Sequence, residues 1–188
     1  MPDTLLLLPG LYDSGPDHWQ SHWQRAWPHA RRVRQRDWET PERAEWVATL
    51  DDAIGAETGP LLLTAHSTAC LLVAHWALAA SAERRARVRG ALLVAPSDPD
   101  GPSYPAGPTG WSPVPLERLP FPSTVVASTN DEYLTMHRAR EYANAWGSRL
   151  VNAGPRGHLN SATMLGMWPE GEHLLAELAR RSASPSSG

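Results

Sequence analysis

Lysine is absent from this chain of 188 residues, so its seventeen basic residues are all arginine. Twenty acidic residues accompany them, and the formal net charge at pH 7 is −3. A balanced charge of this kind argues against a nucleic-acid partner, which would need a strongly basic surface. The densest basic cluster, 31–36, has arginine at alternate positions from Arg32 onward. That spacing is typical of a solvated edge strand.

Cysteine occurs once, at Cys70, so no disulfide can form within the chain. This composition fits a reducing compartment. Long hydrophobic runs are also missing. The apolar segment Leu5–Leu8 is too short for a signal peptide or a membrane helix, and no basic residue precedes it. We therefore expect a cytoplasmic location and no membrane partner.

Signatures of cofactors and metals are likewise missing. The glycines near Gly10 and Gly15 do not form a GxGxxG pattern, so no dinucleotide cofactor is expected. His18 and His22 are spaced as i and i+4, but no third ligand and no HExxH motif accompany them. We expect neither a metal nor an organic cofactor.

Short apolar runs alternate with helix-length segments, which predicts an α/β fold with a mostly parallel sheet. The expected strands are 4–8, 32–36, 61–63, 90–95, 123–128 and 149–152. The expected helices are 17–27, 40–56, 68–76, 132–146 and 162–181. We expect one domain over residues 1–181 and a Ser-rich, disordered tail over 182–188.

Local signals predict where several helices begin and end. Thr40 is the expected N-cap of the second helix, and Pro41 its first residue. Gly147 suits the left-handed position after the 132–146 helix. Pro169 is expected to break the last helix. The segment 96–122 carries nine of the eighteen prolines, and a long irregular segment of this kind is typically functional or mobile.

The stretch 59–76 has the layout of a nucleophile elbow, with Ser67 at a sharp turn between a strand and a helix. A serine hydroxyl needs a general base, and His158 lies in a loop just past the last strand. Asp131 follows the fifth strand and can orient that histidine. The order Ser67, Asp131, His158 is the one expected of α/β-hydrolases. Asp98 and Asp100, which follow the fourth strand, remain alternative acids, although their neighbours are turn residues.

Several stretches together resemble the small serine hydrolases of the RBBP9/YdeN family, within the α/β-hydrolase fold. The matching residues are 8–10, 66–67, 94–96, 127–133, 146–147 and 157–160. The resemblance implies a triad of Ser67, His158 and Asp131. It also implies a three-layer sandwich of six parallel strands in the order 2-1-3-4-5-6, with helices on both faces and no large lid domain.

The elbow departs from the usual Gly-x-Ser-x-Gly pattern, because Ala65 and Ala69 stand where glycines allow close backbone approach. We expect a slightly opened elbow, with Thr68 narrowing the pocket beside the serine. The oxyanion hole is expected to pair the backbone N–H of Thr68 with that of Leu11, with Tyr12 as the second choice.

These residues predict a serine hydrolase that acts through an acyl-enzyme on a small-molecule acyl substrate such as a carboxylic ester. The candidate pocket rim consists of Tyr12, Asp13, His18, Trp19 and Trp111, with Tyr104 as a further cover. The alternative is an interaction module on the same scaffold with little turnover, which the altered elbow motivates. Cofactor-free perhydrolysis on the same triad also stays open.

Overall fold

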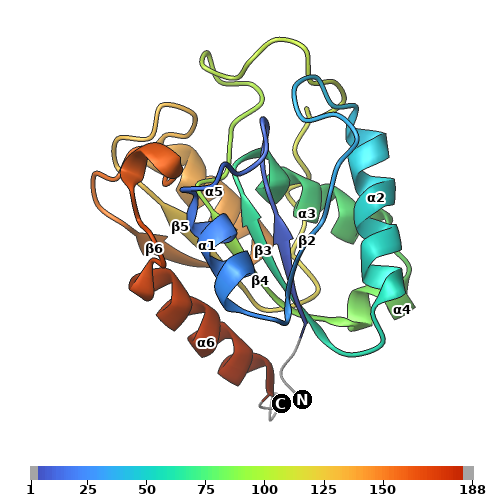
Figure 1. The fold of residues 1–188 in the computed structure, drawn as a ribbon. Helices are drawn as coiled ribbons and strands as arrows, with labels where there is room; N and C mark the ends of the chain where they lie inside the picture. Colours follow the sequence, from blue (N-terminus) through green and yellow to red (C-terminus); the bar gives the residue numbers. More distant parts are fainter. Residues whose placement is uncertain (1–3, 184–188) are drawn as a thin grey trace.

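The computed structural model describes residues 4–183. Within these residues, six strands form one sheet in the order β2-β1-β3-β4-β5-β6, and all neighbouring strands are parallel (Figure 1). This confirms the predicted class and strand order. The strands are β1 (Thr4–Leu8), β2 (Ala30–Arg32), β3 (Leu61–His66), β4 (Val88–Val94), β5 (Ser123–Ala127) and β6 (Arg149–Asn152).

Helices cover both faces of the sheet (Figure 1). They are α1 (Trp19–Ala26), α2 (Arg43–Ala56), α3 (Thr68–Ala79), α4 (Ala82–Ala86), α5 (Met136–Trp146) and α6 (Pro169–Ala183), with a 3₁₀ turn at Ser161–Thr163. Among the helices of residues 4–183, none combines the length and hydropathy of a membrane span. Of the expected tail 182–188, Ser182 and Ala183 end α6, and the remainder lies outside the described residues.

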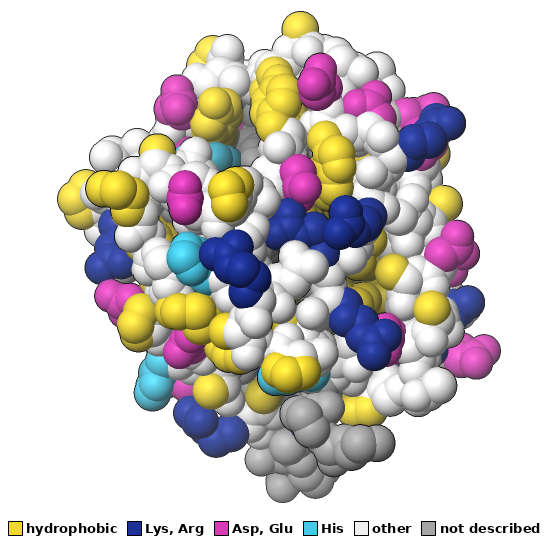
Figure 2. All heavy atoms as spheres, viewed as in Figure 1, with side chains coloured by type: hydrophobic (Ala, Val, Ile, Leu, Met, Phe, Trp, Pro, Cys, Tyr) yellow, Lys and Arg dark blue, Asp and Glu magenta, His cyan; other side chains and the backbone are white. Residues whose placement is uncertain are grey.

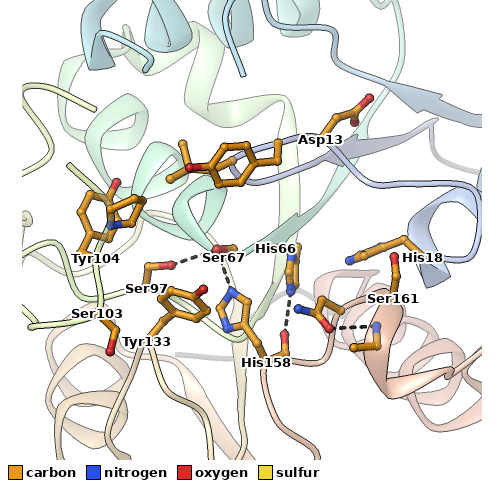
Figure 3. A pocket seen from close by; sticks show the side chains of 15 residues that line it. Asp13, His18, His66, Ser67, Ser97, Ser103, Tyr104, Tyr133, His158 and Ser161 are labelled. Atoms are coloured by element: carbon orange, nitrogen blue, oxygen red, sulfur yellow. Dashed lines mark hydrogen bonds between the residues drawn. The ribbon is translucent and has the colours of Figure 1, made fainter. Parts of the chain in front are cut away.

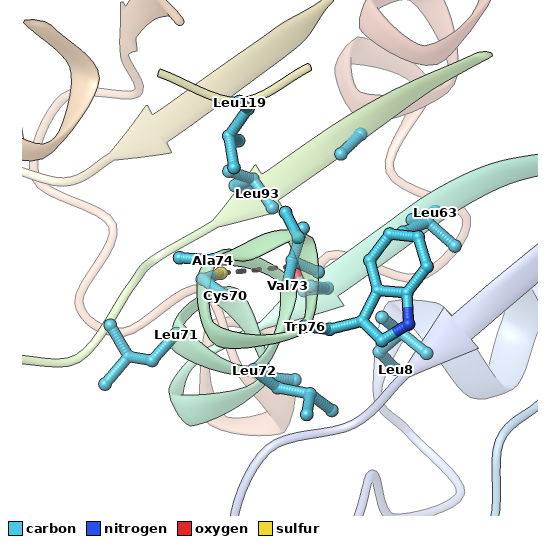
Figure 4. Packing of buried hydrophobic residues seen from close by; sticks show 14 of the residues in the cluster. Leu8, Leu63, Cys70, Leu71, Leu72, Val73, Ala74, Trp76, Leu93 and Leu119 are labelled. Atoms are coloured by element: carbon cyan, nitrogen blue, oxygen red, sulfur yellow. Dashed lines mark hydrogen bonds between the residues drawn. The ribbon is translucent and has the colours of Figure 1, made fainter. Parts of the chain in front are cut away.

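The four inner strands, β1, β3, β4 and β5, are buried on both faces, which explains their largely apolar sequences. Alternate side chains of β1 enter different clusters: Leu5 and Leu7 pack with α1 and α6, whereas Leu6 and Leu8 pack with α2, α3 and α5. Helix α3 lies within the cluster that contains Leu6 and Leu8 (Figure 4), and all its residues from Thr68 to Ala77 are buried. The backbone on both sides of Ser67 is therefore fixed by the core.

On the face viewed in Figure 2, arginine side chains lie among acidic and apolar ones. The edge strand β2 carries part of the basic cluster, as expected, but it spans Ala30–Arg32 rather than 32–36. Its position follows from the register with β1, in which Leu5 pairs with Ala30 and Leu7 with Arg32. The arginines beyond that point lie past the end of the ladder.

The predicted start of α2 is wrong, because a long-range contact holds the residues before it extended. Glu42, not Thr40, is the N-cap, and Pro41 lies outside the helix. The Pro41 carbonyl accepts from the Thr109 amide at 3.0 Å, and the Arg43 amide donates to the Thr109 carbonyl at 3.0 Å. The Thr40 hydroxyl instead donates to Asp37 within a turn.

The starts of α5 and α6 also differ from the prediction. Helix α5 begins at Met136 rather than at residue 132, because Thr135 caps it and the preceding residues form the loop that carries Asp131. It ends as predicted at Gly147, which has φ 67°. Pro169 is the first residue of α6 rather than a break within it, a position where the missing proline N–H has no cost.

Candidate active site

Ser67 lies on a sharp turn between the end of β3 and the start of α3. Its backbone angles are φ 60° and ψ −130°. A non-glycine residue in such a conformation carries strain of order 1–3 kcal/mol, which the surrounding packing must offset. Ala65 and Ala69 on either side are both fully buried, and α3 begins immediately after the serine. The two alanines are therefore compatible with an intact elbow.

A chain of hydrogen bonds connects Ser67 to His158 and Asp131. The distance from Ser67 Oγ to His158 Nε2 is 2.8 Å, and His158 Nδ1 lies 2.9 Å from each carboxylate oxygen of Asp131. The Asp131 side chain is only 1% exposed, and its Oδ1 also accepts from the Tyr133 amide at 2.9 Å. The structure thus brings together the three residues that the sequence selected, and Figure 3 shows Ser67 directed at His158.

The alternative acids do not reach this chain. Asp98 lies 3.4 Å from Arg138 Nε and accepts from the Tyr142 hydroxyl at 3.4 Å. Asp100 accepts from the Ser112 hydroxyl at 2.6 Å and lies 3.6 Å from the same arginine. The residues after β4 therefore hold Arg138 on α5, and Asp131 is the carboxylate paired with His158.

The loop after β1 approaches the serine very closely. A Cβ atom on Gly10 would lie 2.6 Å from Ser67 Cβ and 2.9 Å from the His66 carbonyl oxygen, so the backbone passes where only glycine fits. The N–H groups of Leu11 and Thr68 find no hydrogen-bond acceptor among the described residues. Tyr12, the second choice for an oxyanion donor, instead donates its amide to the Trp38 carbonyl at 2.7 Å.

A cavity of about 350 Å³ opens over Ser67. Of the predicted rim residues, Tyr12, Asp13 and His18 line it, as does Tyr104, the further cover. Trp19 and Trp111 do not, and these two predictions are wrong. Trp19 is 1% exposed because its stripe on α1 faces the core, where its indole N–H donates to the Leu159 carbonyl. Trp111 is also buried, and it packs edge-on against Trp46.

Sequence reasoning missed several polar residues of the cavity wall, namely Ser97, Ser103, Tyr133, Asn160 and Ser161. Ser97 Oγ lies 2.9 Å from Ser67 Oγ. Its position directly after the Val94-Ala95-Pro96 stretch, at the end of a central strand, is the signal that could have indicated it. Tyr104 lies 3.3 Å from the Thr68 hydroxyl, and burial raises its pKa to about 12, so its phenol stays protonated.

Three histidines are neighbours across the site. The ring centroids of His18 and His66 are 4.7 Å apart, and those of His66 and His158 are 4.9 Å apart. His66 Nε2 donates to the His158 carbonyl at 2.8 Å and so anchors the loop that carries the triad histidine. Burial lowers the pKa of His66 well below its usual value and that of His18 to about 3, so both rings are neutral near pH 7.

His18 also has a local structural role, because it caps α1 by accepting from the Gln20 amide at 3.2 Å. With Nδ1 used as the acceptor, the neutral ring carries its proton on Nε2. Across residues 4–183, no three His, Cys, Asp or Glu side chains converge in a metal-binding arrangement, so the spacing of His18 and His22 is left without a further ligand.

The chain is similar in sequence and in structure to known hydrolases. A family model described as serine hydrolase matches residues 5–177. The crystal structure of a YdeN-like hydrolase from Pectobacterium atrosepticum has 34% sequence identity and a TM-score of 0.82, with 95% of this chain and 91% of that one covered. No curated protein sequence matches the chain.

More distant structures share the fold. The ydeN gene product of B. subtilis has 15% identity and a TM-score of 0.73, covering 95% of this chain and 100% of its own. A thermophilic esterase from Thermogutta terrifontis has 15% identity and a TM-score of 0.67, covering 98% of this chain and 92% of its own. At these identities the likeness shows the fold alone, and it agrees with the six-stranded parallel sheet.

The buried His18 predicts a specific dependence of stability on pH. Below pH 6.5 the unfolded chain takes up a proton on His18, which the folded protein takes up only near pH 3. The contribution of neutral His18 to the free energy of unfolding is thus complete above pH 6.5 and is lost as the pH falls, by up to about 1.4 kcal/mol per pH unit.

The variant His18→Asn tests this, because asparagine keeps a capping acceptor but cannot titrate. The free energy of unfolding of this variant, from urea denaturation, should fall less steeply than that of the wild type in this window. Equal slopes would contradict the assignment.

Proposed function

The chain belongs to the serine hydrolase family, and on that premise we propose that it hydrolyses small carboxylic esters through a Ser67–His158–Asp131 triad. The observation that carries the proposal is the hydrogen-bonded chain from Asp131 through His158 to a serine on a strained turn, below an open cavity. A surface serine that only caps a helix has no need of such a chain, and the Ser67 side chain makes no capping bond.

Acylation follows from the proton positions. Asp131 accepts from His158 Nδ1–H, which leaves Nε2 free to accept the Ser67 proton at 2.8 Å. Ser67 Oγ attacks the ester carbonyl, and the proton passes to His158. The tetrahedral intermediate then expels the alcohol, which takes the proton from the imidazolium, and an acyl-enzyme remains. Asp131 holds His158 in the tautomer that is protonated on Nδ1, and it stabilises the His158 imidazolium once that forms.

The oxyanion of each tetrahedral intermediate would bind to the N–H groups of Thr68 and Leu11. The Thr68 amide is at the N-terminus of α3, where the helix dipole favours negative charge. The Leu11 amide belongs to the loop that Gly10 allows to lie against Ser67. Donors fixed by backbone geometry need no reorganisation when charge develops, which is why they stabilise a transition state well.

The cavity favours small and uncharged acyl compounds. Its volume of about 350 Å³ is at the low end of the roughly 300–1,000 Å³ usual for ligand pockets. Hydroxyl groups dominate its polar wall, and no arginine is among the described residues that line it. Asp13 adds a carboxylate, although one paired with Arg32 at 2.5 Å. An anionic acyl group would therefore find no cation there.

The triad assignment predicts a sharp contrast between two aspartates. Ser67→Ala should lower kcat for p-nitrophenyl acetate at least about 10⁴-fold. Asp131→Asn should lower kcat by a similar factor, because His158 is then no longer held in the tautomer whose Nε2 accepts the Ser67 proton. Asp98→Asn, the matched control, should retain turnover because Asp98 pairs with Arg138 instead. Initial rates on folded proteins, verified by circular dichroism, measure this.

Two results would decide against the triad. Unchanged turnover in Ser67→Ala would exclude that serine as the nucleophile. Loss of turnover in Asp98→Asn but not in Asp131→Asn would make Asp98 the acid. Absence of ester turnover in the folded wild type would favour the interaction module instead.

The close approach of Gly10 predicts a large kinetic effect from one methyl group. Gly10→Ala would push the Leu11 amide away from Ser67 and should lower kcat/KM about 10²- to 10³-fold, as loss of one oxyanion donor does. Gly59→Ala is the matched control, because its Cβ would have no atom within 4 Å. Steady-state kinetics on both variants test this, and equal activities would remove the loop from the oxyanion hole.

A further inference from the structure

Ser97 is held rigidly beside the nucleophile. Ala95, with φ 47°, turns the chain at the end of β4, and its amide donates to the Val126 carbonyl at 2.8 Å. One residue after Ser97, the Asp98 amide donates to the Tyr133 carbonyl at 3.0 Å. Ser97 itself is 2% exposed, and its Oγ is 2.9 Å from Ser67 Oγ (Figure 3).

The direction of this hydrogen bond follows from counting protons. His158 Nδ1–H is directed at the Asp131 carboxylate, so Nε2 of the neutral ring is an acceptor. The only hydroxyl proton of Ser67 is then donated to Nε2. Ser67 Oγ has no second proton to give, and Ser97 must therefore donate to it. The nucleophilic oxygen thus accepts one hydrogen bond in the resting enzyme.

The strength of that hydrogen bond changes along the proposed reaction. A hydroxyl oxygen accepts well, an oxygen with alkoxide character accepts more strongly, and an ester oxygen accepts poorly because its lone pair is delocalised into the carbonyl. The bond is therefore moderate in the free enzyme, weak in the acyl-enzyme and strongest in the transition states where Ser67 Oγ gains or loses its carbon partner.

We propose that Ser97 is a catalytic residue that acts mainly in deacylation, by donating a hydrogen bond to Ser67 Oγ as that oxygen leaves the acyl group. The inference rests on the proposed function and goes beyond its three triad residues. Removing the donor raises the deacylation barrier more than the acylation barrier, because acylation starts from a state in which the bond already exists and deacylation does not.

The chemical step is balanced without any further reactant. Water adds to the acyl carbonyl and gives one proton to His158 Nε2. The tetrahedral intermediate then collapses: the bond between the acyl carbon and Ser67 Oγ breaks, its electron pair goes to Oγ, and the His158 proton follows. The products are the carboxylic acid and the free enzyme. Throughout the collapse, the Ser97 O–H stays directed at Oγ and keeps its own proton.

The test separates the two half-reactions in Ser97→Ala. With saturating p-nitrophenyl acetate, kcat is measured, and the steady-state fraction of acetylated enzyme is read by acid quenching and intact-protein mass spectrometry. Together these give the acylation and deacylation rate constants. We expect the deacylation constant to fall about tenfold and the acylation constant less than about threefold, since stronger and weaker hydrogen bonds differ by roughly this much. The acetylated fraction should therefore rise.

Two further variants secure the result. Ser97→Cys keeps the shape but donates weakly through sulfur, so it should shift both constants in the same directions by less. Ser123→Ala is the matched control, because it removes the buried partner of another serine pair, Ser123 and Ser148 at 2.6 Å, at the start of β5 and away from the site. It should leave both rate constants unchanged.

The outcomes distinguish this inference from the proposed function. Equal falls in both constants, a fall in acylation alone, or no change in Ser97→Ala would overturn the role of Ser97 while wild-type turnover and a Ser67 acyl adduct still supported the hydrolase. A wild type with neither turnover nor an adduct would overturn both.

Discussion

The positive φ of Ser67 is maintained because the chain on both sides of it is buried, over all of β3 and over α3 from Thr68 to Ala77. The Ser67 amide continues the sheet by donating to the Val94 carbonyl at 3.0 Å, and the helix starts at the next residue. With the main chain fixed in this way, the hydroxyl lies at the edge of the sheet where the other strands end, 2.8 Å from His158 Nε2. The loop at Gly10 and the loops that bear Asp131 and His158 all meet at this point. The site is thus a consequence of parallel strands whose carboxyl ends share one edge.

The sequence predicts this much because Ser67 and Asp131 each follow a short apolar run that indicates a buried strand, and His158 lies in the loop past the last strand. The order of Ser67, Asp131 and His158 along the chain was therefore enough to predict the triad, without any knowledge of spatial contacts. The error at the start of α2 arose where a distant contact overrides a local signal. Thr40 and Pro41 look like the start of a helix, but the bridge between Glu42 and Thr109 keeps that segment extended.

Placement of the remaining pocket residues was harder to predict for related reasons. Aromatic residues near the site were expected at its rim. Trp19 and Trp111 are instead buried in the core, where burial of their large apolar surface stabilises the fold. The aromatic residues that do line the cavity are Tyr12, Tyr104 and Tyr133, and hydroxyl groups dominate its polar wall. Ser97 reaches Ser67 because Ala95 adopts a positive φ. Alanine rarely adopts this conformation, so the sequence does not predict the turn. The proline-rich segment 96–122 supplies Ser97, Ser103 and Tyr104 to the cavity, which gives that irregular stretch a place in the site.

Labelling with a fluorophosphonate, followed by peptide mapping, shows whether Ser67 is an activated nucleophile, because the reagent modifies a serine only if a neighbouring base activates it. Ser97, Ser103 and Ser161 line the same cavity and serve as internal comparisons. We expect a single phosphonyl adduct on Ser67 that disappears in His158→Ala. An unlabelled but folded wild type, or an adduct on another of these serines, would contradict this expectation.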